Sequence, residues 1–191
     1  MTIKIEGNWN KGLAYDVHTL GSTYLGEDEN GRKRWDSTRT EMGSLLHGLK
    51  YQGKKVNAPK MVDLITAKIK GLDTFDVIVP VPPSKPRPFQ PVYELAEELG
   101  RRKRVKVLYA LEKVTSNVEI KNIENPDERR EALEKTMRIT GDYDLSGKKV
   151  LLLDDLFRSG ISLEVATKIL YEQTKADTIN VLTMTKTRSN R

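Results

Sequence analysis

Short apolar runs alternate with amphipathic segments along the second part of the chain, from residue 76 onward. Four of these runs predict buried strands: 77–81, 105–110, 150–153 and 179–184. The segments 91–102 and 163–173 repeat apolar residues at the spacing of one helical face, which predicts helices. Strands that alternate with helices are typical of βαβ units. We therefore expect an α/β fold with a mostly parallel sheet of about five strands, flanked by helices.

The pattern before residue 76 is different. Residues 1–36 mix apolar and polar positions and contain turn signals such as Asn30-Gly31, which predicts a small strand-rich, antiparallel element. Two amphipathic helices are expected after it, one around residues 42–49 and one over 59–70. We therefore divide the chain into an N-terminal element, 1–36, and a core that follows it, 37–191.

The segment 112–136 has little apolar content, apart from a charged helix expected to begin near Pro126. Long exposed excursions from a compact core often serve as lids over a site. We expect this segment to be a mobile excursion of the core.

Amino-acid composition and net charge limit the location of the protein and the classes of partner that it can bind. The 191 residues include no cysteine, which excludes disulfides, thiolate metal sites and thiol nucleophiles and fits a reducing, cytoplasmic location. No run approaches the roughly 20 apolar residues of a membrane helix, and the first residues lack a signal-peptide core, so we expect a soluble, unprocessed protein with no membrane partner. A net charge of +6 favours anionic partners, either phosphorylated small molecules or nucleic acid.

The most informative segment is 150–162, with the sequence VLLLDDLFRSGIS. An apolar strand ends in two acids, Asp154 and Asp155, and a short loop around Gly160 then opens a helix. Backbone N–H groups at a helix start bind phosphate, and Ser159 and Ser162 add hydroxyl donors. The acids can accept hydrogen bonds from ribose hydroxyls or help to hold a metal. This arrangement predicts a site for a phosphorylated sugar at the carboxyl end of a strand.

Three other interpretations compete with a sugar-phosphate site at residues 150–162. A P-loop ATPase needs a G-x-x-x-x-G-K-[ST] loop, and the stretch from Gly141 to Lys149 has five residues between its glycines and a lysine at the hydroxyl position. A nucleophilic-aspartate phosphatase needs a second acid where Leu156 stands. The third interpretation, which stays open, is a buried strand followed by a helix with an acidic cap and no chemistry.

The segment 150–162 resembles the phosphoribosyl pyrophosphate (PRPP) motif of type I phosphoribosyltransferases: four apolar residues, two acids, an apolar residue, two variable positions and Ser-Gly-x-Ser. Other stretches resemble the ComF-like branch of this family, known from competence proteins and similar to amidophosphoribosyltransferases. They are Leu49-Lys50-Tyr51, the VPVPP stretch at 79–83, and the helix with DERR at 127–130. The resemblance implies a type I phosphoribosyltransferase fold, in which residues 1–36 would form a small N-terminal hood.

The resemblance also implies roles for individual residues. Asp154 and Asp155 would engage the ribose hydroxyls and, indirectly, magnesium. Lys113 and Arg129, together with Lys121, would close over the leaving pyrophosphate as part of a lid. The 5′-phosphate would be wrapped by Arg158, Ser159, Gly160, Ile161 and Ser162, and the pyrophosphate by the loop with Pro82, Pro83, Ser84, Lys85 and Arg87.

The reaction implied by the resemblance is displacement of pyrophosphate from PRPP by a nitrogen nucleophile, with Mg²⁺ as cofactor and no protein residue assigned as a direct metal ligand. Members that use 6-oxopurines carry an acid where Arg158 stands, so we expect an amine or an acidic acceptor instead. Association of two copies of the chain into a homodimer is compatible with this interpretation.

The alternative to a phosphoribosyltransferase is a regulatory protein on the same fold that senses PRPP or handles nucleic acid without turnover. Its strongest support is the basic cluster Arg101–Arg104 with Lys106, although cations at a helix C-terminus also stabilise the helix. Nucleic acid is therefore the less favoured partner. His18 and His47 have no neighbouring metal ligands in sequence, so we expect no metal site at either one.

Overall fold

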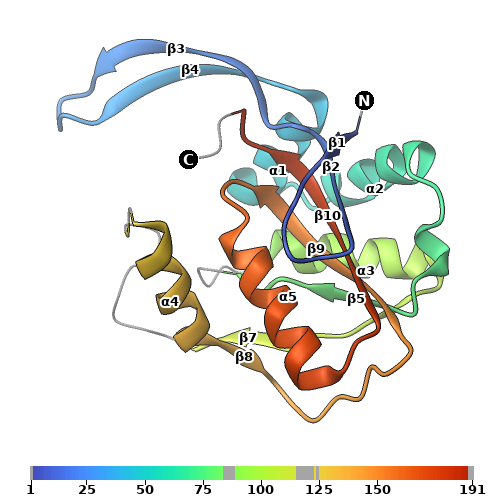
Figure 1. The fold of residues 1–191 in the computed structure, drawn as a ribbon. Helices are drawn as coiled ribbons and strands as arrows, with labels where there is room; N and C mark the ends of the chain where they lie inside the picture. The colour runs from blue at the N-terminus through green and yellow to red at the C-terminus, as the bar shows by residue number, and fades with distance from the viewer. Residues whose placement is uncertain (1, 84–88, 115–122, 124, 189–191) are drawn as a thin grey trace.

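The computed structural model describes residues 2–83, 89–114, 123 and 125–188 (Figure 1). Its strands are β1 (Ile3–Lys4), β2 (Lys11–Val17), β3 (Thr19–Glu27), β4 (Lys33–Arg39), β5 (Val77–Pro80), β6 (Lys106–Val107), β7 (Leu111–Lys113), β8 (Met137–Ile139), β9 (Lys149–Phe157) and β10 (Thr178–Lys186). Its α-helices are α1 (Glu41–Gln52), α2 (Asn57–Lys68), α3 (Pro91–Lys103), α4 (Pro126–Thr136) and α5 (Ile161–Thr174), and a short 3₁₀ helix spans Leu72–Thr74. None of the helices described is long and apolar enough to cross a membrane.

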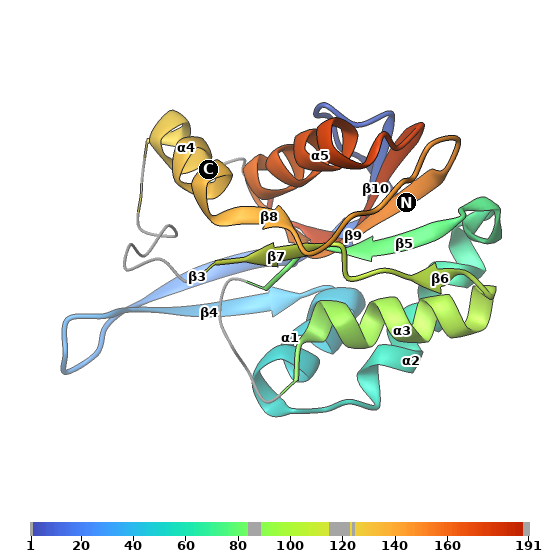
Figure 2. The same cartoon turned by 90° about the horizontal axis from the view of Figure 1, so that it is seen from below.

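A six-stranded sheet forms the centre of the molecule, in the order β1-β2-β10-β9-β5-β6. The neighbours from β2 to β6 are parallel, and only β1 runs antiparallel, at the edge. Helix α5 covers one face of this sheet and α1, α2 and α3 cover the other (Figure 2). The α/β class and the mostly parallel, helix-flanked sheet are therefore confirmed.

The apolar run in β9 is continuous because both of its faces are buried. Val150 and Leu152 pack in the core under α5, whereas Leu151 and Leu153 pack in the core under α1, α2 and α3. The fully buried run gives way within β9 to Asp154 and Asp155, toward the carboxyl edge of the sheet.

The N-terminal residues lie in two places rather than in one antiparallel element. Strand β2 joins the central sheet in parallel with β10, whereas β3 and β4 form a separate hairpin that extends away from the body (Figure 1). Trp9 is 7% exposed, and its Nε1 donates a hydrogen bond to the Ile5 carbonyl at 3.1 Å, so it belongs to the core. The local pattern misses this division because the partner of β2 is more than 160 residues away in the sequence.

A strand ladder closes the base of the excursion, and helix α4 is held against α5. A short antiparallel ladder pairs β7 with β8, which sequence analysis did not predict. Helix α4 begins at Pro126, as expected, with Asn125 accepting hydrogen bonds from the next backbone N–H groups. It packs beside α5, where Arg130 pairs with Glu164 at 2.6 Å. These contacts bring the start of α4 toward the carboxyl edge of the sheet.

Candidate functional site

A cavity of about 330 Å³ lies at the carboxyl ends of β5 and β9 and at the first turns of α3 and α5. Ten of the residues predicted for the site line it: Pro82, Pro83, Lys113, Arg129, Asp154, Asp155, Arg158, Ser159, Gly160 and Ser162. The predictions for Ser84, Lys85, Arg87 and Lys121 lie outside the described residues. The fold thus brings residues from the strands, the α5 loop and the excursion to one place.

Helix α5 presents its N-terminus to this cavity. Its first backbone N–H groups have no partner within the helix, and its dipole places partial positive charge there. Ser159 and Ser162 line the cavity, but the side chain of Ile161 is 5% exposed and packs in the core. Ile161 can therefore contribute only its backbone N–H to an anion. The start of α3, at Gln90 and Pro91, also lines the cavity and was not predicted as part of the site.

The backbone conformation at position 160 requires a glycine. It precedes α5 with φ of +82°, in the left-handed region that favours glycine. A Cβ at this position would lie 3.0 Å from the Phe157 ring. The loop is thus shaped by its own backbone and by Phe157, and a side chain at this position would press on Phe157 rather than occupy the space of a phosphate.

Lys50 is a site residue to which sequence analysis gave no role. It comes from α1, and its Nζ donates to both carboxylate oxygens of Asp155, at 3.0 and 2.8 Å. Both side chains are largely buried, with exposures of 21% and 15%. The only sequence signal was its place in Leu49-Lys50-Tyr51, because 105 residues separate it from its partner. The pair holds the Asp155 carboxylate in a fixed orientation.

The pKa of Asp154 is shifted by its surroundings. Burial, and then the negative charge of Asp155, raise its pKa from 3.8 to about 7. The backbone N–H of Asp155 donates to Asp154 Oδ1 at 2.8 Å, and the charges of Lys113 and Lys50 also oppose the rise. Near neutral pH the Asp154 carboxyl therefore exists in both protonation states, so it can donate or accept a hydrogen bond.

Asp154→Asn should stabilise the protein more at pH 8 than at pH 5. Because the folded state binds this proton more tightly than the unfolded state, the wild-type free energy of unfolding falls as the pH rises from about 4 through about 7. The amide removes this dependence, and urea unfolding at the two pH values measures it. Asp144→Asn is the control: hydrogen bonds from Ser146 lower the pKa of Asp144, so this variant should gain nothing at pH 8. An equal effect of Asp154→Asn at both pH values would contradict the assignment.

The side of the cavity formed by the excursion is cationic. Burial lowers the pKa of Lys113 and of Arg129, and the charge of Arg158 lowers that of Arg129 further. Arg129 Nε is buried and has no hydrogen-bond partner among the described residues. With Lys50, four cationic side chains line the cavity against two carboxylates. This balance suits a ligand with several phosphate groups.

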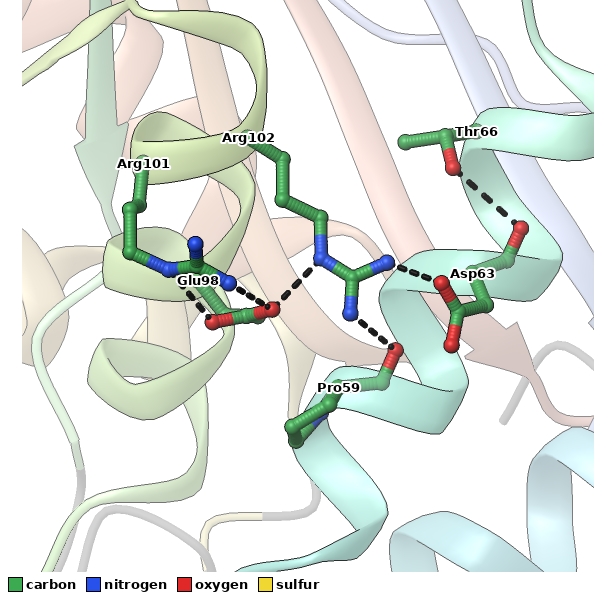
Figure 3. Close-up of polar contacts among 6 residues, drawn as sticks. All are labelled: Pro59, Asp63, Thr66, Glu98, Arg101 and Arg102. Carbon is green, nitrogen blue, oxygen red and sulfur yellow. Dashed lines mark hydrogen bonds and ion pairs between the residues drawn. The ribbon is translucent and has the colours of Figure 1, made fainter.

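Two members of the basic cluster at the end of α3, Arg101 and Arg102, form ion pairs within the protein. Arg101 and Arg102 both donate to Glu98, and Arg102 also bridges to Asp63 and to the Pro59 carbonyl on α2 (Figure 3). The contacts of Arg102 fasten α3 to α2. Arg102 therefore has a structural role, whereas Arg101 is 70% exposed and pairs within its own helix.

No protein-family model matches the chain, and no curated protein matches it. Among solved structures it is similar to an adenine phosphoribosyltransferase from Thermoanaerobacter pseudethanolicus, with 14% identity, coverage of 86% of this chain and 94% of that chain, and a TM-score of 0.47. It is also similar to a hypoxanthine phosphoribosyltransferase from Staphylococcus aureus (11% identity, 72% and 67% covered, TM-score 0.46) and to an orotate phosphoribosyltransferase from Aeropyrum pernix (13%, 85% and 71%, 0.42).

Proposed function

We propose that the protein is a phosphoribosyltransferase that moves the 5-phosphoribosyl group of PRPP to a nitrogen nucleophile and releases pyrophosphate. The observation that carries this proposal is that Asp154 and Asp155, in the second half of β9, line one cavity with the N-terminus of α5 and with Lys113 and Arg129. One end of the cavity suits a monophosphate, its centre a ribose and its other side a second anion. The PRPP-motif resemblance of 150–162 supports the same reading.

The 5′-phosphate would sit at the start of α5. The backbone N–H groups of residues 159–161 and the hydroxyls of Ser159 and Ser162 supply donors, and the exposed Arg158 adds charge. Anchoring the phosphate there would place the ribose over the end of β9, where Asp154 and Asp155 can accept hydrogen bonds from its hydroxyls.

The two carboxyl groups also suit the positive charge that develops at the reacting carbon of the ribose. As the bond from the anomeric carbon to pyrophosphate breaks, positive charge develops on the ribose, and the Asp155 carboxylate, held by Lys50, lines the cavity that would contain it. The electron pair of that bond leaves with pyrophosphate, and the nitrogen lone pair forms the new bond. No nucleophilic side chain is required. Lys113 and Arg129 would stabilise the charge that builds up on the leaving group.

The donor set fits magnesium held largely by the substrate. Asp155 has both oxygens bonded to Lys50, and the described residues contain no cluster of three or more metal-ligating side chains. Mg²⁺ in phosphate sites usually keeps several waters and takes one or two carboxylates beside phosphate oxygens, and Asp154 can supply such a contact. When bound, the ion would neutralise charge on the pyrophosphate.

Pyrophosphate release from PRPP, measured with Mg²⁺ and a panel of amines, carboxylated nitrogen heterocycles, hypoxanthine and guanine, tests the proposal. We expect release that depends on at least one amine or acidic acceptor, and no efficient turnover of either purine, because Arg158 cannot act as a base near neutral pH. PRPP that binds but is not turned over with any acceptor would instead support a PRPP-sensing protein. The ComF-like branch, the homodimer and the cytoplasmic location stay predictions.

A further inference from the structure

The β3–β4 hairpin, residues 19–39, exposes large apolar side chains to solvent. Four of them are between 48% and 58% exposed: Leu20, Tyr24, Leu25 and Trp35. Tyr24 lies directly opposite Trp35 on the neighbouring strand, and their ring centres are 5.1 Å apart, so the two rings stand on one face of the hairpin. Large apolar side chains that gather on an exposed projection mark an interaction surface.

The hairpin is a two-stranded sheet of its own. It extends away from the body, and within the described residues no third strand pairs with either of its edges (Figure 1). A two-stranded hairpin is at best marginally stable in water, and each open edge offers a row of backbone N–H and C=O groups for pairing with another chain. The hairpin is therefore a partial sheet that further strands would complete.

The two edges of the hairpin differ in charge. Strand β4 carries four charged residues among its seven: Lys33, Arg34, Asp36 and Arg39. Charged side chains on an edge strand oppose pairing with another chain. Strand β3 has no charged residue and no proline over residues 19–26, and its single charged residue, Glu27, is its last. The β3 edge, unlike the β4 edge, is therefore open to pairing.

Charge along the β3 edge is complementary to itself when two copies run antiparallel. The tip that follows β3 is acidic, with Glu-Asp-Glu at residues 27–29, and the basic residues 32–34 lie on the β4 side of the hairpin. The base of the hairpin is positive: Arg39 ends β4 there, and Arg188 donates to the Leu20 carbonyl at 2.5 Å. Antiparallel pairing of two β3 strands brings the acidic tip of each copy to the basic end of the other.

We propose that the protein forms a dimer in which the β3 strands of two copies pair antiparallel, edge to edge, and make one four-stranded sheet. The same edge serves both copies, as a twofold axis requires. An axis perpendicular to this sheet puts both Tyr24–Trp35 pairs on one face, and the two bodies lie at opposite ends of it. No residue of the hairpin lines the cavity, so the association is independent of the proposed reaction.

A single-stranded nucleic acid is the competing occupant of this surface, because bases stack on exposed aromatic side chains. The hairpin is a poor electrostatic match for it. Residues 19–39 contain four acidic and four basic residues and carry no net charge, and the tip that follows β3 is acidic. A surface with segregated but balanced charge suits a second copy of this chain better than a polyanion.

Sedimentation velocity of the full chain tests the dimer. Edge pairing of one strand buries little surface, so we expect weak association, with the 21.7 kDa monomer shifting toward twice that mass at about 100 µM. Thr23→Lys puts like charges together in the middle of the paired edge and should weaken association by about tenfold or more. Thr23 lies opposite Asp36, so a lysine there is compatible with the hairpin itself. Thr38→Lys, at an exposed threonine on β4, is the matched control and should associate as the wild type does.

Cross-linking shows which edge is paired. The chain contains no cysteine, so a single introduced thiol is the only one present. With a short bismaleimide, Thr23→Cys should give a covalent dimer and Thr38→Cys should not, because residues opposite or diagonal to each other on paired strands lie within about 8 Å. A chain that stays monomeric at the highest concentration, association unaffected by Thr23→Lys, or equal cross-linking of the two cysteine variants would overturn the inference. So would binding of an oligo(dT) strand to a chain that does not self-associate.

Discussion

Arg129→Ala and Lys113→Ala are each expected to lower kcat/KM for PRPP by about 10²- to 10³-fold, the range seen when one preorganised donor to developing charge is removed. Both side chains line the cavity on the side proposed for pyrophosphate. Arg129 brings a buried Nε with no partner among the described residues, so the leaving group would satisfy it. Steady-state pyrophosphate release measures the effect.

Arg130→Ala is the matched control for this experiment. Arg130 is the next residue on α4, is 42% exposed and pairs with Glu164 on the α5 side, away from the cavity lining. We expect its removal to change kcat/KM little, since half-exposed ion pairs contribute little. If Arg129→Ala and Arg130→Ala had the same small effect, the excursion would have no part in the reaction.

The second large effect is expected from Gly160→Val. A non-glycine residue at φ of +82° costs about 1 to 2 kcal/mol, and a β-branched side chain would also press on the Phe157 ring, which lies 3.0 Å from the Cβ position. The loop must move, which displaces the donors at the start of α5. We expect a lower Tm and a loss of ribose 5-phosphate affinity of about 100-fold, in line with the cost of misplacing a binding group by about 1 Å.

Gly147→Val separates the loss of stability from the loss of ribose 5-phosphate affinity. Gly147 has φ of +70°, and nothing lies within 4 Å of its Cβ position. It therefore shares the backbone strain, but it is outside the cavity lining. We expect this variant to lower Tm and to leave ribose 5-phosphate affinity unchanged. Equal losses of affinity in the two variants would show that Gly160 acts only through stability.

The parts of the fold that were predictable are those fixed by local sequence. The β9–α5 unit could be located because a strand buried on both faces, two acids, a glycine and an amphipathic helix follow one another without a gap. The same continuity placed Asp154, Asp155 and the 158–162 loop together. Helices α3 and α4 were likewise signalled by their own apolar spacing or by the proline at their start.

The parts that were missed depend on pairing between distant segments. The parallel pairing of β2 with β10 and the ladder of β7 with β8 leave no local signal that distinguishes them from a hairpin or a loop. Lys50 reaches Asp155 only because α1 packs over the carboxyl edge of the sheet, and a lysine on a helix face is otherwise typical of solvated surface.

The most direct test of the central claim is a crystal structure of the protein with ribose 5-phosphate and Mg²⁺. We predict that the phosphate lies at the N-terminus of α5, within hydrogen-bond distance of Ser159 and Ser162, and that the ribose hydroxyls face Asp154 and Asp155. A sugar phosphate bound elsewhere, or a cavity that stays empty at millimolar ligand, would contradict the assignment of this site to a phosphoribosyl group.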